Sequence, residues 1–154
     1  TIMHQEFCKI FSKFVEENDI KENEFGLEIT ETAELEDTQK AGESLERLKK
    51  RGIKIALDDF GAGYASLKYI RDLPIDVVKL DRHFTSNISD PSTSRLIKFV
   101  SDVCAELNLE MIGEGIETEQ EKNMMIDLGC ETGQGFLMHM PSFIEDIMKE
   151  KNDG

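Results

Sequence analysis

Two adjacent carboxylates follow an apolar run in the segment LDDFGAGYASL, which begins at Leu57. Asp58 and Asp59 stand between that run and a pair of glycines. Two unit charges about 4 Å apart repel by roughly 4 kcal/mol at an effective dielectric constant near 20. Water can offset this repulsion at a surface, and a metal ion can offset it in a site. The pair is therefore the first candidate for metal binding.

Polar groups follow the other apolar runs of the chain in the same way. The set comprises Glu28 and Glu31 in LEITE, Lys79, Asp81 and Arg82 in VVKLDR, Glu114 and Glu117 in GEGIE, and Gln134 in GQGF. If these runs are parallel strands of a barrel, their carboxyl ends lie on one face, where such folds assemble their active sites. We therefore expect the polar groups to converge there.

A convergence of this kind has a definite chemistry. Four carboxylates in one place would repel one another unless cations held them. A set of oxygen ligands without thiolates or imidazoles favours hard ions such as Mg²⁺ or Mn²⁺. Two such ions about 3.5–4 Å apart are a usual device for hydrolysing a phosphodiester, because they activate a water and stabilise the leaving oxygen. The pattern therefore predicts a two-ion site that acts on an anionic substrate.

Each of these residues also has a structural interpretation. Taken alone, Glu28 would be a solvated strand residue and Asp58–Asp59 a turn and helix-cap pair. Lys79 needs a carboxylate partner if it is buried, but that partner can be purely structural. Glu114 could be a turn residue and Gln134 an ordinary loop amide, so the coincidence of five strand ends carries the prediction. The three histidines show no ligand spacing and are interpreted as surface or filler residues: His4, His83 and His139.

Apolar spacing predicts strands and helices that alternate along the chain. Strands are expected over residues 24–30, 53–57, 76–80, 109–113 and 131–133, and helices over residues 37–51, 91–107 and 142–149. Further helices are expected in the N-terminal segment, after the glycine loop as far as Tyr69, and after a capping box at Thr118–Glu121. This order predicts an α/β fold with a parallel sheet. A small doubly wound sheet is the alternative, although no GxGxxG fingerprint supports it.

Helical spacing also indicates which side chains share a face. In the N-terminal segment one buried face is expected to carry Phe7, Ile10, Phe11, Phe14 and Val15. In the helix over residues 91–107, the apolar residues expected on one side are Leu96, Val100, Val103 and Leu107.

The composition describes one folded domain without a membrane segment. The chain has 154 residues, 39% of them hydrophobic, which is enough for a sizeable core. A net charge of −14 disfavours nucleic-acid polymers and anionic membranes as partners. No apolar run is long enough to span a bilayer, and no signal peptide is visible. Cys8, Cys104 and Cys130 are widely spaced, which predicts free thiols and a cytoplasmic location.

Five motifs, taken together and in this order, resemble the EAL-type phosphodiesterases, bacterial enzymes that cleave cyclic di-GMP to linear pGpG. They are LEITE at 27–31, LDDFGAGYASL at 57–67, LPIDVVKLDRHF at 73–84, GEGIETEQE at 113–121 and GCETGQGFLMHMP at 129–141. The resemblance covers nearly the whole chain. It implies a TIM-like barrel, Mg²⁺ or Mn²⁺ as cofactor, cyclic di-GMP as substrate and a role in bacterial signal transduction.

The resemblance also implies roles for individual residues near the metal. Glu28 and Asp58 would be metal ligands, and Asp59 would help to hold the second ion. Lys79 would orient or polarise the attacking water. Glu114 would act as a base or as a ligand of the second ion.

Further roles concern the substrate and a loop. Gln134 would lie close to the water and the metal. Gly61 and Gly63 would be hinges of a mobile loop that links metal binding, substrate binding and dimerisation, and Glu31 would steady that loop. The remaining residues assigned to this face are Asp81, Arg82 and Glu117.

The chain departs from the family by what it lacks. The family's barrel has about 250 residues, whereas this chain supplies about five βα units after one helix. No E-A-L tripeptide occurs in the site context, and an asparagine ligand and a substrate-binding arginine of the family are absent too. We therefore expect residues 1–154 to be the C-terminal portion of a single EAL-type domain, a partial TIM-like (β/α) barrel. Such a piece should bind metal weakly and hydrolyse cyclic di-GMP poorly or not at all.

Two classes of function fit this pattern, and a structural α/β domain is a third interpretation. The first is a piece of a metal-dependent phosphodiesterase, and the second is a non-catalytic module for cyclic di-GMP binding, regulation or dimerisation. Every ligand position that is present keeps the expected residue, which favours the first. The unpaired edges of an open barrel predict a homodimer or a domain-swapped oligomer. An upstream sensor or cyclase domain is compatible with either class.

Overall fold

The structure is a computed structural model, and it describes residues 10, 11, 13, 14, 17, 18, 25–30, 37–62 and 66–142. Within these residues five parallel strands form one sheet and follow one another across it in chain order. They are β1 (Gly26–Thr30), β2 (Lys54–Phe60), β3 (Val77–Leu80), β4 (Glu110–Gly113) and β5 (Thr132–Gly133). A barrel wall has this sequential order, whereas a doubly wound sheet reverses it at a switch point. The predicted partial barrel is confirmed, and the doubly wound alternative is wrong.

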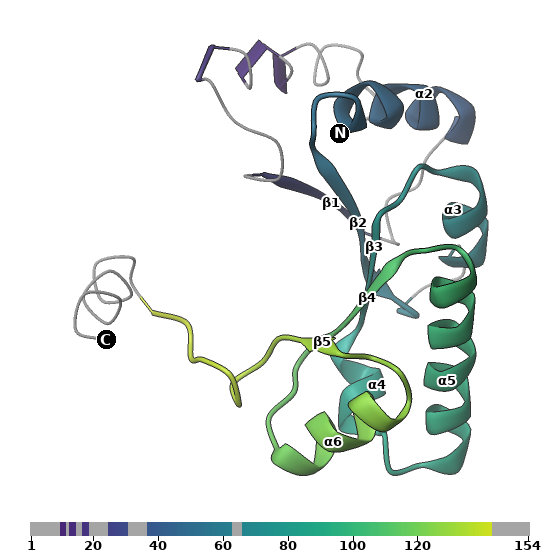
Figure 1. The fold of residues 1–154 in the computed structure, drawn as a ribbon, viewed down its shortest axis with the longest axis vertical. Coiled ribbons are helices and arrows are strands. Elements are labelled where there is room, and N and C mark those ends of the chain that lie inside the picture. The colour runs from purple at the N-terminus through teal and green to yellow at the C-terminus, as the bar shows by residue number, and fades with distance from the viewer. Residues whose placement is uncertain are drawn as a thin grey trace.

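Helices connect the strands and cover one face of the sheet. The helices α2 (Thr38–Lys49), α3 (Ser66–Asp72) and α5 (Pro91–Glu106) lie along the same side of it (Figure 1). The helix α6 (Glu119–Asp127) connects β4 to β5. A short helix that the sequence did not predict, α4 (Arg82–Ser86), follows β3. The helix expected over residues 142–149 lies outside the described residues, apart from its first position.

Side-chain caps set where several helices begin. The capping box predicted at Thr118–Glu121 is present, with each side chain bonded to the other residue's backbone. Asp90 opens α5 by accepting hydrogen bonds from two backbone N–H groups of the first turn. Asp81 opens α4 by accepting a hydrogen bond from the backbone N–H of His83 at 2.8 Å. Asp81 therefore has a structural contact in addition to the site role expected for it.

The two faces of the sheet differ in burial along β1, β2 and β4, whereas all four residues of β3 are buried. On the helix-covered face Ile29, Leu57, Val78 and Met111 lie in register across four strands, and each is at most 7% exposed. The alternate positions of the same strands face the other way. They include Glu28, Ala56, Val77 and Lys79. The hydrophobic core therefore sits between the sheet and the helices.

The packed side of α5 differs from the prediction. The buried residues of this helix are Ile97, Val100, Ser101 and Cys104. Leu96 and Leu107, which were expected on the apolar side, are 54% and 50% exposed. The prediction was correct for Val100 and wrong for Leu96 and Leu107, because α5 carries more apolar residues than one buried face can hold and spacing alone does not choose between the faces.

The N-terminal segment also departs from the expected single buried face. Phe11 packs against the core, but Ile10 and Phe14 are 68% and 45% exposed. The rings of Phe11 and Phe14 stack with their centroids 6.5 Å apart. Phe7 and Val15 lie outside the described residues.

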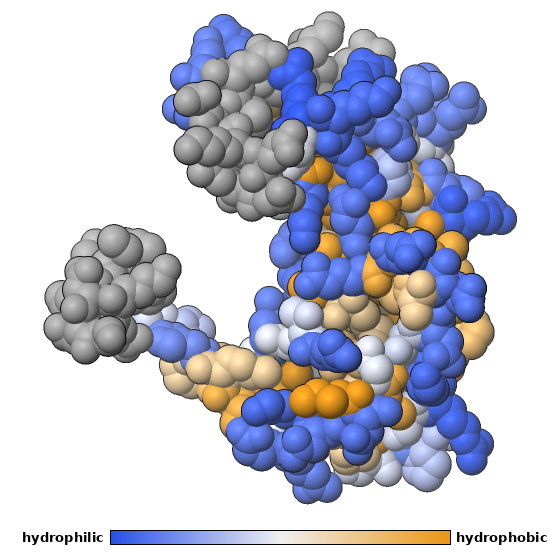
Figure 2. All heavy atoms as spheres, viewed as in Figure 1, coloured by the Kyte–Doolittle hydropathy of each residue, from blue (hydrophilic) through white to orange (hydrophobic). Residues whose placement is uncertain are grey.

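Cys104 and Cys130 are free, as the cysteine spacing predicted, and both are buried, whereas Cys8 lies outside the described residues. Burial raises the pKa of both thiols to about 11, so they stay protonated at neutral pH. Among the described helices, none is long and apolar enough to cross a membrane. Figure 2 shows apolar side chains along the segment after β5, where Phe136, Met138 and Met140 are exposed.

Candidate metal centre

A β-bulge brings the adjacent aspartates to one edge of the sheet. Leu57 pairs with Val78 and Phe60 pairs with Leu80, so β2 holds one residue more than β3 between these pairs. Asp59 has a φ of 55°, a left-handed conformation that is uncommon for residues other than glycine. In a regular strand the side chains of Asp58 and Asp59 would point to opposite faces. The bulge thus explains why both can contribute to one cluster, and it extends the expected strand from Leu57 to Phe60.

Lys79 is the centre of an ion cluster that spans four strands. Its Nζ lies 2.9 Å from Glu28 Oε1, 2.8 Å from Asp58 Oδ1 and 2.8 Å from Glu114 Oε1. Its side chain is only 9% exposed. Burial by itself would lower the pKa of Lys79, but the carboxylates of Asp58, Glu114 and Glu28 stabilise its charged form, outweigh burial and raise it. Lys79 is therefore a protonated cation whose donors are directed at carboxylates.

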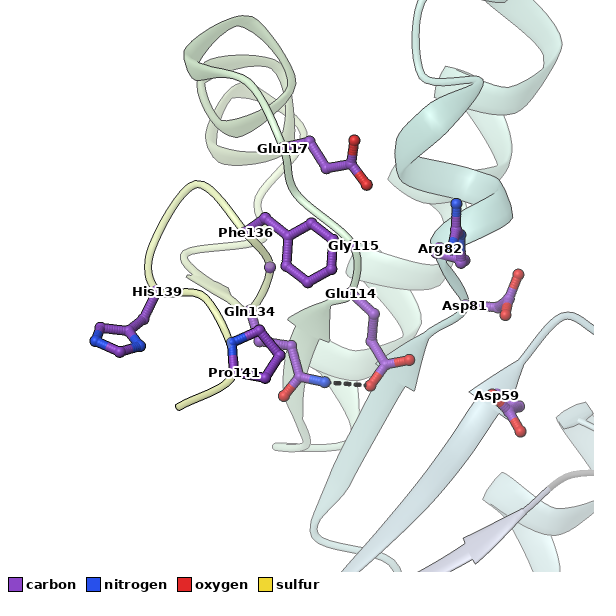
Figure 3. Close-up of a pocket in the computed structure, with 11 residues that line it drawn as sticks. Asp59, Asp81, Arg82, Glu114, Gly115, Glu117, Gln134, Phe136, His139 and Pro141 are labelled. Atoms are coloured by element: carbon purple, nitrogen blue, oxygen red, sulfur yellow. Dashed lines mark hydrogen bonds between the residues drawn. The ribbon is translucent and has the colours of Figure 1, made fainter. Parts of the chain in front are cut away.

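Glu114 stands directly after β4 and is held from two sides. Gln134 Nε2 donates a hydrogen bond to Glu114 Oε1 at 2.5 Å (Figure 3). The same oxygen contacts Lys79, and the backbone N–H of Glu114 donates to Leu80 O at 3.1 Å. Burial raises the pKa of the Glu114 carboxyl group, and Lys79 partly opposes this. The neighbouring strand and the loop after β5 together fix this carboxylate.

The cluster carries more negative than positive charge. Glu28, Asp58 and Glu114 contact one ammonium group, and Asp59 lies close to Asp58 and Glu114. Burial, followed by repulsion from Asp58, raises the pKa of Asp59. Asp58 Oδ1 is buried and has no hydrogen bond of favourable geometry among the described residues, although Lys79 Nζ lies 2.8 Å away. The contact is thus one of charge, and it leaves this oxygen able to bind a cation.

Three carboxylates of the cluster can converge on one ion. One oxygen each from Asp58, Asp59 and Glu114 lies within 4.8 Å of the other two. All three residues are partly buried, and the group includes neither thiolate nor imidazole. Oxygen donors of this kind suit Mg²⁺ or Mn²⁺ better than softer metals. The donor chemistry and the excess negative charge therefore fit a hard divalent ion.

A pocket of about 390 Å³ opens beside these carboxylates. Its polar lining includes Asp59, Asp81, Arg82, Glu114, Glu117 and Gln134. The aromatic ring of Phe136, which is 55% exposed, also lines it (Figure 3). The predicted substrate-side residues Asp81, Arg82 and Glu117 thus share one cavity with part of the ion cluster.

Of the three predicted loop residues, the structure describes only Gly61. Gly61 has a φ of 97°, and an added Cβ would lie 2.1 Å from Phe84 Cε2, so the turn requires glycine. Gly61 follows β2 and does not line the 390 Å³ pocket. Glu31 and Gly63 lie outside the described residues, and their predicted roles stay predictions.

Sequence reasoning missed several residues of the pocket. Phe136, His139 and Pro141 line it, although His139 was interpreted as a surface or filler residue. Gly115 lines it as well, with a φ of 66° and an added Cβ only 2.6 Å from Arg82 Cβ. The GEG and GQG triplets were the available signal, because each glycine follows a polar residue of the site.

Comparison with known proteins finds one matching protein family and named relatives of this chain. The family model described as "EAL domain" matches residues 1–141. The chain is 40% identical over 116 residues to the cyclic di-GMP phosphodiesterase PdeA of Borreliella burgdorferi, which covers 75% of this chain and 17% of that protein. It is 35% identical over 123 residues to the bifunctional diguanylate cyclase/cyclic di-GMP phosphodiesterase MucR of Pseudomonas aeruginosa, covering 79% of this chain and 18% of that protein.

Solved structures match more of the fold. The EAL domain of Mycobacterium smegmatis DcpA superimposes with a TM-score of 0.91 at 28% identity, covering 99% of this chain and 69% of that one. A manganese/cy-diGMP complex of Klebsiella pneumoniae BlrP1 superimposes with a TM-score of 0.78 at 26% identity, covering 88% of this chain and 35% of that one. The curated relatives are thus several times longer than the part that this chain matches.

Proposed function

The chain belongs to the EAL domain family, and from this premise we propose that residues 1–154 are the C-terminal portion of a metal-dependent cyclic di-GMP phosphodiesterase domain. Hydrolysis of one phosphodiester would open the cyclic dinucleotide to linear pGpG. The names of PdeA and MucR include this activity for those relatives. The acidic cluster beside a pocket supports the proposal for this chain.

The proposed metal ligands are Asp58, Asp59 and Glu114, with Glu28 as a further ligand. Asp58, Asp59 and Glu114 already place one oxygen each within 4.8 Å of one another. Glu28 contacts the same lysine from β1, and its side chain is 54% exposed, so it can turn toward an ion. Bound Mg²⁺ or Mn²⁺ would lower the pKa of a water and stabilise negative charge on the reacting phosphate.

Lys79 acts in this proposal as a donor and a fixed positive charge. Its raised pKa excludes it as a general base at neutral pH, because it holds its proton there. Its contacts with Glu28, Asp58 and Glu114 set the spacing of carboxylates from three strands. When a cation takes over some of these contacts, the ammonium group can donate to the attacking water and orient it.

Glu114 is the proposed proton acceptor or second-ion ligand. Lys79 and Gln134 both contact its Oε1. Its second oxygen points to the side where Asp59 and Asp81 lie (Figure 3). A carboxyl group with a raised pKa accepts a proton more readily than an ordinary one. Gln134 thus supports catalysis by fixing one oxygen and leaving the other for water or metal.

The pocket offers groups that suit a guanine nucleotide. Phe136 presents an aromatic face on which a base can stack. Asp81 and Glu117 supply acceptors for the N–H groups of guanine, and Arg82 supplies a cation for a phosphate. The loop residues Glu31, Gly61 and Gly63 keep the role that the family resemblance implies, which is to couple metal and substrate binding.

The observation that carries the proposal is the contact of Lys79 with three carboxylates, two of which belong to the proposed metal ligands Asp58, Asp59 and Glu114. An assay of cyclic di-GMP hydrolysis tests it. The chain is incubated with cyclic di-GMP and Mn²⁺, and pGpG is measured by chromatography. We expect slow, Mn²⁺-dependent production of pGpG that EDTA and Asp58→Asn abolish, with the phosphodiesterase PdeA as the reference. Binding of cyclic di-GMP that needs no Mn²⁺ and gives no pGpG would support the non-catalytic module instead. Absence of both binding and turnover would contradict both.

We also propose that the chain self-associates as a homodimer or a domain-swapped oligomer. Within the described residues, β1 and β5 each have a strand neighbour on one side only. Sedimentation of a well-folded monomer at high protein concentration would contradict this. A cytoplasmic location and an upstream sensor or cyclase domain are further proposals, supported by the reduced cysteines and by the cyclase named in MucR.

A further inference from the structure

We propose that Thr85 is a positioning residue for Glu114, an inference that rests on the proposed function. Thr85 belongs to the short helix α4 and is 0% exposed. Its Oγ1 lies 2.5 Å from the backbone carbonyl oxygen of Glu114 and 2.9 Å from that of Arg82. A hydroxyl group has one proton to donate, and the shorter contact is the one to Glu114. Thr85 therefore bonds the helix to the residue that carries the proposed base.

The backbone of Glu114 is held at both ends by the same neighbouring segment. Its N–H donates to Leu80 O at the end of β3, and its C=O accepts from Thr85 shortly after β3. The next residue, Gly115, turns the chain with a φ of 66°. An added Cβ there would lie 2.6 Å from Arg82 Cβ, so the turn packs directly on α4. The direction of the Glu114 side chain thus depends on where α4 lies.

This arrangement links the two strands that carry the lysine and the glutamate. Lys79 is in β3, and α4 begins two residues after the end of that strand. Glu114 follows β4 and reaches Lys79 Nζ at 2.8 Å and Gln134 Nε2 at 2.5 Å. Loss of the Thr85 hydroxyl would leave a partly buried carbonyl oxygen without this donor. The turn would then shift to find another donor, and the Glu114 carboxylate would move with it.

The experiment compares variants that differ in one hydroxyl group. Thr85→Val keeps the branched shape and removes the donor, whereas Thr85→Ser keeps the donor. Ser94→Ala is the matched control, because Ser94 Oγ makes the same kind of 2.5 Å bond to Ile88 O without touching Glu114. Two readouts are taken on the folded chain: Mn²⁺ affinity by calorimetry, and the NMR shift of the Gln134 side-chain amide protons. The second readout reports the bond to Glu114 without any metal.

Thr85→Val should weaken Mn²⁺ binding by about 10- to 100-fold, the range found for outer-shell partners of metal ligands. It should also return the Gln134 amide signal to the position of a solvent-exposed amide. Thr85→Ser and Ser94→Ala should keep both readouts at the level of the unsubstituted chain. A purely structural role for Thr85 would lower thermal stability in Thr85→Val without changing either readout.

The outcomes separate this inference from the proposed function. Wild-type affinity and an unchanged Gln134 signal in folded Thr85→Val would overturn the positioning role. Equal changes in Ser94→Ala would also overturn it, because any lost hydroxyl bond would then have the same effect. If the unsubstituted chain binds no Mn²⁺, the proposed metal site fails, and the Gln134 signal alone decides the role of Thr85. If Thr85→Val does not fold, Thr85→Ala is measured in its place against the same outcomes.

Discussion

The helix-covered face of the sheet and its carboxyl edge follow opposite physical rules. On the face, Ile29, Leu57 and Val78 are neighbours in register and at most 2% exposed. At the edge, carboxylates crowd around Lys79, and Asp59 takes a left-handed backbone conformation. Burial of apolar area stabilises the first region by roughly 25 cal/mol per Å². The second region holds repulsion and strain, which burial elsewhere must offset.

Strand β2 passes through both regions. Ile55 and Leu57 are 0% exposed on the helix side, and the next two residues form the bulged aspartate pair. The buried residues Ile55 and Leu57 therefore anchor β2 in the core, and this anchoring holds Asp58 and Asp59 at the carboxyl edge. Damage to the two regions should separate experimentally, with loss of stability in one and loss of metal chemistry in the other.

The largest expected effect is on folding, from a substitution far from the edge. Leu45 in α2 is 0% exposed, so Leu45→Ala should reduce the free energy of unfolding by about 2–5 kcal/mol. Chemical denaturation measures this value. Mn²⁺ affinity, measured by calorimetry where the variant is folded, should not change. A parallel loss of affinity would break the proposed separation of the two regions.

The next largest effect is expected at the carboxyl edge of the sheet, from loss of the Lys79 charge. Lys79→Met should reduce pGpG production by about 100-fold or more, the cost of losing a charged group that acts on the reacting centre. Thermal stability should fall at pH 7, because three carboxylates lose their shared cation, and added Mn²⁺ should restore part of it. Lys98→Met is the control, since its pair with Asp102 is exposed. Turnover equal to wild type would exclude a catalytic role for Lys79.

A smaller effect concerns pH. Burial raises the pKa of Asp59 and Glu114 above the ordinary values of 3.8 and 4.5. The metal-free folded state then binds more protons than the unfolded state above those values, so these groups reduce stability as pH rises through their folded pKa. Mn²⁺ binds the deprotonated form, so its added stabilisation should grow over the same range. Melting curves with and without Mn²⁺ that respond identically to pH would contradict this.

The smallest expected effect lies on the outer surface of α5. Phe99 is 53% exposed, so Phe99→Ser should change the free energy of unfolding by no more than about 0.5 kcal/mol. Denaturation at low protein concentration measures this for the monomer. A loss of unfolding free energy comparable to that of Leu45→Ala would mean that the outer surface of α5 is packed and belongs to the hydrophobic core.

Local signals in the sequence predicted much of the fold. The five strands and the capping box at Thr118–Glu121 arise from nearby residues, and the structure contains them. Helix α4 was missed because five residues are too few to show an apolar period. The buried side of α5 was predicted correctly at Val100 but misassigned at Leu96 and Leu107, because both sides of the helix carry apolar residues and only the sheet selects between them.

The residues of the candidate site could be predicted where a charged side chain stands at a strand end. They could not be predicted where only the folded backbone brings a side chain into the site. Lys79 in a strand, the aspartate pair and Glu114 were identified because charge at a strand end is costly without partners. The bulge at Asp59 was not predictable, since simple alternation places adjacent side chains on opposite faces. Phe136 lines the pocket but was not predicted to do so, because an exposed phenylalanine has no distinct pattern in the sequence.

The central claim is that the carboxyl edge binds a divalent cation through Asp58 and its neighbours, and calorimetric titration with Mn²⁺ tests it most directly. The unsubstituted chain is compared with Asp58→Asn and with Asp102→Asn, which removes the same charge from an exposed helix pair. We expect Asp58→Asn to weaken Mn²⁺ binding by about 100-fold or more, at least the upper range for outer-shell changes, while Asp102→Asn has no effect. Equal affinity in all three proteins would contradict it.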